Sequence, residues 1–149
     1  MAAETEKAKF ELAITFVKNE RDLYCLVLET NEKSPHYDMW VAPTEGIEPG
    51  ETPKYAAIRA MDEEAGIWGE ITSDPYTKEK TIKGGFIRQH YFSAELIDFS
   101  AKFLDKPEYG DKQKAWFSAN QILNLKMLGG KQIASYLPQI MIWIWDWLN

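Results

Sequence analysis

Cysteine is nearly absent from this sequence of 149 residues: Cys25 stands alone, so no disulfide can form within one chain. A lone thiol favours a reducing compartment, and we expect a cytoplasmic protein. No apolar run reaches the length that spans a bilayer, and the first residues contain no apolar signal core. Internal repeats, low-complexity tracts and linkers are also lacking. We therefore expect one domain over residues 1–149, with a flexible tail at 1–8 and no membrane partner.

An excess of positive charge is lacking as well. Lys and Arg number 17 against 23 Asp and Glu, which gives a net charge of -6. Broad binding to nucleic-acid phosphates needs the opposite balance, so we expect no nucleic-acid partner. A local basic pocket remains compatible with this charge. Hydrophobic residues make up 45% of the chain, which is the share expected of a globular domain with its own core.

The order of the expected elements is strands, helix, strands and helices. Strand-forming residues fill 10–17 and 23–29, and the five polar residues between them predict a hairpin. Shorter or later strands are expected at 40–43, 67–73, 86–97 and 115–117, with a basic connection at 78–85 and a charged loop at 102–112. Helices are expected at 53–65, at 119–125, and at 131–149 with a kink at Pro138. This order predicts an α/β fold in which helices pack on a mixed sheet.

The central helix carries several charged residues in a specific spacing. Thr52 suits its N-cap, and Gly66 suits its C-terminal end. Arg59 and Glu63 are four residues apart and share one face, while Glu64 lies about 100° further round. One interpretation is a solvated face with an ion pair worth a few tenths of a kcal/mol. The other is a set of carboxylates that holds a divalent cation against a phosphate.

The stretch from residue 45 to 67 resembles the Nudix box, the signature of the Nudix (MutT-like) hydrolases, G-x5-E-x7-R-E-U-x-E-E-x-G-U, where U is bulky and apolar. An ungapped alignment places seven residues on the pattern: Glu51, Arg59, Met61, Glu63, Glu64, Gly66 and Ile67. The resemblance implies a Nudix-type α/β/α sandwich with a mixed β-sheet. It also implies catalytic and metal-binding roles for Glu63 and Glu64 with Mg²⁺ or Mn²⁺, and an ion pair between Glu51 and Arg59.

Two positions depart from the family pattern. Glu45 occupies the position of the opening glycine, where a glutamate resists a positive φ. Ala60 occupies the position of a glutamate that is commonly a metal ligand in the family, and the Thr44 carbonyl maps to another ligand. Three accounts remain open. Glu45 substitutes for the missing ligand, the protein binds its ligand without turnover, or Ala60 is an introduced change that traps a substrate.

The resemblance implies a metal-dependent hydrolase that cleaves a diphosphate linkage in a small anionic phosphorylated substrate. The alternative is a catalytically impaired Nudix-fold protein that binds a nucleotide or an inositol phosphate. Two stretches, WVAPTEGIEP and YGDKQKAWFSANQI, are similar to the diphosphoinositol polyphosphate phosphohydrolases. Ala115 departs from that group, which often has a glutamate there. The candidate substrates are a nucleoside diphosphate derivative, a dinucleoside polyphosphate and a diphosphoinositol polyphosphate.

Basic residues near expected loops are candidates for substrate binding in this acidic chain: Lys83, Arg88, Lys112 and Lys114. Ordinary solvated side chains are the alternative for each of them.

The C-terminal run PQIMIWIWDWLN is apolar on nearly every helical face, which is unusual for a surface helix. We therefore expect a homodimer through this helix. Attachment to a membrane surface is the second interpretation, although the run lacks the basic face that a membrane-surface helix needs.

Overall fold

The computed structural model describes residues 8–99 and 113–148. The expected loop at 102–112, the candidate Lys112 and residues 1–7 of the expected tail lie outside the described residues. None of the helices in the described ranges is long and apolar enough to cross a membrane.

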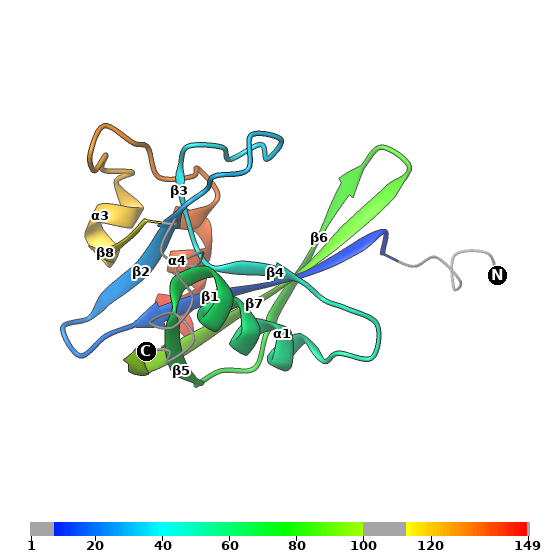
Figure 1. The fold of residues 1–149 in the computed structure, drawn as a ribbon, viewed down its shortest axis with the longest axis horizontal. Helices are drawn as coiled ribbons and strands as arrows, with labels where there is room; N and C mark the ends of the chain where they lie inside the picture. Colours follow the sequence, from blue (N-terminus) through cyan, green and yellow to red (C-terminus); the bar gives the residue numbers. More distant parts are fainter. Residues whose placement is uncertain (1–7, 100–112, 149) are drawn as a thin grey trace.

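The strands of the described residues form one mixed sheet of eight strands (Figure 1). Along the main path the order is β3-β2-β1-β7-β5, while β4 pairs with β1, β6 with β7 and β8 with β2. β1 and β7 run parallel, and the other pairs are antiparallel. The strands are β1 Phe10–Lys18, β2 Leu23–Leu28, β3 Trp40–Val41, β4 Thr44–Gly46, β5 Ile67–Ile71, β6 Tyr76–Ile82, β7 Gly85–Phe99 and β8 Lys114–Ser118.

Helices cover both faces of this sheet. Figure 1 shows α1 in front of the sheet and α4 behind it, so the expected α/β/α sandwich is confirmed. The helical segments are α1 Pro53–Ala60, the π-helical turn η2 Met61–Ala65 that continues it, α3 Ala119–Leu123 and α4 Leu137–Leu148. Ser118 caps α3 through a reciprocal pair of hydrogen bonds with Gln121, which explains why the sequence signal for this helix was clear.

Small residues let α1 approach the sheet closely. Ala56 and Ala57 pack with Ala13 of β1 and Phe92 of β7, and all four are buried. The Thr15 hydroxyl on β1 donates a hydrogen bond of 3.1 Å to the Ala57 carbonyl. A helix with longer side chains on this face would stand further from β1. This close packing fixes the position of the helix that carries the charged residues.

The expected basic connection at 78–85 is wrong, because most of it is strand β6. β6 and β7 form a hairpin that turns at Gly84, where φ is 84°. The hairpin projects from the body of the sheet (Figure 1), and most of β6 is exposed or half-buried. A strand with little burial shows no alternation of polar and apolar residues, which is the usual sequence signal for a strand.

The last helix begins at Leu137 and not at residue 131. Residues 132–134 instead pair with Trp40 on the edge of the sheet: the Trp40 amide donates to the Gln132 carbonyl, and the Ala134 amide donates to the Trp40 carbonyl. Pro138 lies in the first turn of α4, where its missing N–H removes no intrahelical hydrogen bond. The expected kink therefore does not occur.

Candidate functional site

The central helix begins and ends where the sequence indicates. The Thr52 hydroxyl accepts a hydrogen bond of 3.1 Å from the Tyr55 amide and caps the first turn. Gly66 ends the helix with a left-handed φ of 64°. Between them the helix widens into the π-helical turn η2, which contains Glu63 and Glu64. Such turns occur frequently at functional sites.

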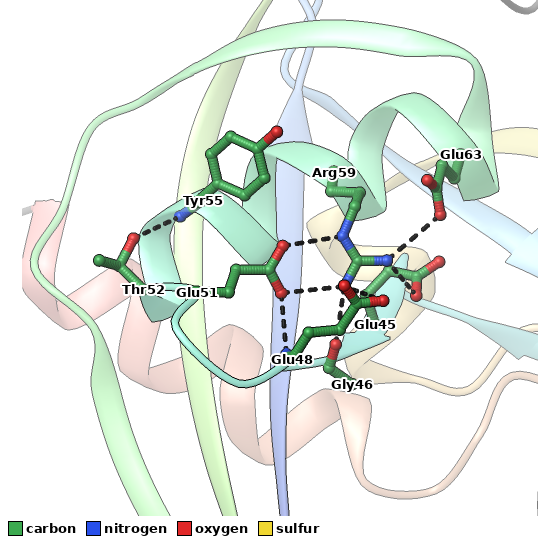
Figure 2. Close-up of polar contacts among 8 residues, drawn as sticks. All are labelled: Glu45, Gly46, Glu48, Glu51, Thr52, Tyr55, Arg59 and Glu63. Atoms are coloured by element: carbon green, nitrogen blue, oxygen red, sulfur yellow. Dashed lines mark hydrogen bonds and ion pairs between the residues drawn. The ribbon is translucent and has the colours of Figure 1, made fainter.

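Arg59 lies at the centre of a group of carboxylates (Figure 2). Its Nε and Nη2 donate to the two Glu51 oxygens at 2.9 and 3.0 Å, which is the paired geometry that suits a guanidinium. Its Nη1 donates to Glu45 at 3.0 Å and to Glu63 at 3.3 Å. Nη2 also donates to the Gly46 carbonyl at 2.8 Å. One side chain thus joins β4, the loop before α1 and the turn η2.

The register of β4 against β1 brings Glu45 into this group. Glu45 pairs with Ala13, whose side chain packs against α1, while Thr44 pairs with Ile14. Because side chains alternate along a strand, Glu45 projects toward α1 and Thr44 toward the other face. The glutamate is also free of the backbone strain considered above. The non-glycine residues with a positive φ in the described ranges are others: Asp22, Asp38 and Leu125.

The electrostatic balance around Arg59 remains negative. The hydrogen bond from Arg59 lowers the pKa of Glu51, and Glu51 in turn raises the pKa of Arg59. Burial, together with the nearby Glu64 and Glu63 carboxylates, raises the pKa of Glu45 to about 7 although Arg59 acts in the opposite direction. One arginine therefore does not neutralise these carboxylates, and a cation placed among them is favoured.

The donor atoms fit a hard divalent cation in their chemistry. Carboxylate and carbonyl oxygens are the ligands that Mg²⁺ and Mn²⁺ prefer. As they stand, the described residues contain no group of three or more acidic, histidine or cysteine side chains arranged to hold a metal ion. In this structure the Arg59 Nη1 contacts both Glu45, at 3.0 Å, and Glu63, at 3.3 Å. A cation would compete with Arg59 for these two carboxylates.

Ala60 is fully buried, with an exposed fraction of 0%. Its neighbour Met61 is equally buried, so this turn of the helix packs into the protein interior. The position that carries a glutamate in the family pattern is therefore covered by neighbouring atoms. A longer acidic side chain at residue 60 must either displace them or reach the carboxylates beside Arg59.

Of the basic candidates within the described residues, Lys83 and Arg88 lie away from the carboxylates. Arg88 lies on the β6–β7 hairpin, 3.5 Å from Glu11 and 3.8 Å from Glu79. Lys83 precedes Gly84 at the turn of that hairpin. Lys114 is the exception, because its Nζ donates a hydrogen bond of 3.0 Å to the Ala65 carbonyl at the end of η2. The contacts to the carbonyls of Gly46 and Ala65 went unpredicted, since backbone acceptors leave no mark in a sequence.

A hollow of about 510 Å³ lies at the other end of the central helix. Its lining comes from the start of α1 and from the loop after β5: Thr52, Pro53, Lys54, Ile71, Thr72, Ser73, Asp74, Pro75 and Phe92. Pro53 and Glu63 are ten residues apart, or roughly 15 Å along a helix axis. This hollow is therefore separate from the carboxylates.

A mixed sheet between helices, with a glutamate-bearing helix held by an arginine to the preceding loop, is the arrangement that the resemblance implied. Residues 11–139 match the family model of the NUDIX domain. The chain therefore belongs to the Nudix family. This confirms the expected fold and the expected class of protein, a hydrolase.

Solved structures of similar fold cover nearly the whole chain. A NUDIX hydrolase from Nitrosomonas europaea has a TM-score of 0.68 at 19% identity, over 94% of this chain and 89% of its own. The MutT protein from Methanosarcina mazei Go1 has a TM-score of 0.63 at 15% identity, over 97% and 98%. A UDP-X diphosphatase has a TM-score of 0.67 at 15% identity, over 97% of this chain and 66% of its own. At these identities the likeness supports the fold alone.

Proposed function

We propose that this protein hydrolyses a diphosphate linkage with a divalent cation, Mg²⁺ or Mn²⁺, held by Glu63, Glu64, Glu45 and the Thr44 carbonyl. The observation that carries the proposal is the position of Glu45. Glu45 shares the Arg59 Nη1 with Glu63, and its pKa is raised by burial and then by the Glu64 and Glu63 carboxylates. A third carboxylate thus lies beside the two motif glutamates, although Ala60 provides none.

The protein's own residues would divide the work as follows. The bound cation would neutralise the diphosphate and lower the pKa of a water. Glu64 acts as a ligand, and Glu63 as a ligand or as the base that takes a proton from the attacking water. Glu51 fixes the Arg59 guanidinium, and Arg59 orients Glu45 and Glu63 from its Nη1. The protein thereby holds its carboxylates in place before substrate arrives.

The substrate belongs to one of three groups under this proposal: nucleoside diphosphate derivatives, dinucleoside polyphosphates and diphosphoinositol polyphosphates. All three present a diphosphate linkage with several negative charges. The first group contains the kind of substrate for which a protein of the same fold, the UDP-X diphosphatase, is named, and the two stretches noted in the sequence favour the other two groups.

The test is turnover on a panel with one member of each group, with Mg²⁺ and with Mn²⁺. The chain is compared with its Glu64→Gln variant, for which we expect a loss on the order of 100-fold in kcat. Glu48→Gln is the matched control, since Glu48 lies 4.0 Å from Arg59 and its side chain is 71% exposed. We expect it to retain the parent rate. If neither the parent nor Ala60→Glu turns over any of the substrates, the hydrolase proposal is wrong.

A second candidate function is ligand binding without turnover, and the buried Ala60 favours it. In this case calorimetry detects binding of a panel member to the parent, but no product forms. Ala60→Glu then gains activity, because it restores the carboxylate of the family pattern. If the parent is active and Glu45→Gly is inactive, Glu45 is instead the substitute ligand.

A further inference from the structure

We infer that Lys114 is a positioning residue of the proposed metal site, because its ammonium group fixes the end of the helix that carries Glu63 and Glu64. The expected effect of Lys114 on metal binding rests on the proposed function. It assigns Lys114 a role different from the substrate contact that its charge first suggested.

The contact joins two parts of the fold that are distant in the sequence. Lys114 is the first residue of β8 and pairs with Val27 of β2 in the sheet. Its Nζ lies 3.0 Å from the Ala65 carbonyl oxygen, 49 residues away, and the bond is partly buried. The sheet thus holds the C-terminal end of the helix directly, through a charged donor.

The C-terminal turn of this helix has an electrostatic problem that a cation relieves. The last carbonyls of a helix lack intrahelical partners and carry partial negative charge. Here the same turn also carries three carboxylates, Asp62, Glu63 and Glu64. Negative side chains at this end oppose the helix dipole. A lysine that donates to the Ala65 carbonyl offsets this repulsion at the residue next to Glu64.

The π-helical turn makes this support more important. The Gly66 amide bonds to the carbonyls of both Asp62 and Met61, so the turn is wider than an α-helical one. Ala65 lies at its end with an exposed fraction of 1%. A buried carbonyl needs a donor, and Lys114 supplies it. Because Glu64 directly precedes Ala65, fixing this peptide also fixes the backbone from which the Glu64 carboxylate projects.

Burial is consistent with a structural contact. Lys114 is half-buried, and this burial lowers the pKa of its ammonium group. Removing an ammonium group from water costs free energy unless a hydrogen-bond acceptor replaces the lost water. The Ala65 carbonyl is such an acceptor.

The experiment separates positioning from substrate contact by measuring metal binding without substrate. Lys114→Met and Lys114→Arg are compared with the parent and with Lys126→Met, a control at an exposed lysine. Electron paramagnetic resonance gives the Mn²⁺ affinity, and hydrogen exchange follows the amides of residues 61–67. For Lys114→Met we expect an affinity about tenfold weaker, faster exchange in this segment, and a loss in kcat larger than any rise in KM. Lys114→Arg should restore part of each, and Lys126→Met should match the parent.

Each result has a defined meaning. Parental Mn²⁺ affinity and parental exchange in Lys114→Met overturn the inference, even if KM rises. A parent that binds no Mn²⁺ contradicts the proposed metal site, and the exchange measurement then still tests whether Lys114 holds the helix end. Circular dichroism verifies folding. If the methionine variant does not fold, Lys114→Gln takes its place in every measurement with the same criteria.

Discussion

At the scale of single residues, Arg59 determines the geometry of the site. Its guanidinium meets Glu45, Glu51, Glu63 and the Gly46 carbonyl at once. A planar group with five donors can satisfy such a set, whereas an ammonium on a flexible chain cannot. The planar shape of the Arg59 guanidinium, and not only its positive charge, is therefore needed for these contacts.

Arg59→Lys tests this statement. The substitution keeps the charge but loses the paired contact with Glu51, so we expect Tm to fall by about 3–6 °C. Differential scanning calorimetry in EDTA provides the measurement. Arg88→Lys is the matched control, because the contacts of Arg88 are longer and more exposed, and we expect little change. Equal effects of the two substitutions would contradict a special role for Arg59.

Cys25 offers a second test at this scale. It is fully buried on β2, and burial raises the pKa of its thiol to about 12, with a smaller opposite effect from Lys114. Only the thiolate reacts with iodoacetamide. We expect negligible labelling of the folded protein at pH 8 and rapid labelling in guanidinium chloride, followed by mass spectrometry. Fast labelling without denaturant would show that the β2–β8 region opens readily.

At the scale of elements, the sequence predicted features that depend on neighbouring residues and missed features that depend on residues distant in the chain. The cap at Thr52 and the left-handed Gly66 could be predicted because both depend on neighbouring residues alone. The β6 strand was missed since it has little burial, and the start of α4 was misplaced because residues 132–134 bond to Trp40. The side-chain direction of Glu45 depends on the register between β4 and β1, which the sequence does not state.

Gly66→Ala tests the helix end. At a φ of 64° an alanine is strained, so we expect a loss of about 1–2 kcal/mol in the free energy of unfolding. Urea denaturation measures it. Gly46→Ala is the control, because a Cβ there meets no atom within 4 Å and φ is not positive. A stable Gly66→Ala protein would mean that the turn η2 ends in another way.

At the scale of the whole molecule, the two helical layers have different tasks. α1 and η2 carry the charged residues, while α4 closes the opposite side of the core through Ile140, Met141 and Ile144, which are buried. The resemblance to a family predicted this layered fold, since the motif residues that maintain the fold are present. The same motif predicts less about the chemistry of the site, because Glu45 and Ala60 depart from it at two positions.

The expected homodimer through α4 is a property of the whole molecule and stays a prediction. Ile142 is 53% exposed on this helix, beside Trp143, which stacks on Tyr76 at 4.9 Å. If α4 meets a second copy, Ile142→Glu places a charge in an apolar interface and should convert the dimer to a monomer without loss of Tm in dilute solution. Light scattering after size exclusion measures the mass, and Gln132→Glu, at an exposed position outside α4, is the control. A parent chain that is monomeric at every concentration would contradict the dimer, and the exposed isoleucine would then be an ordinary surface residue.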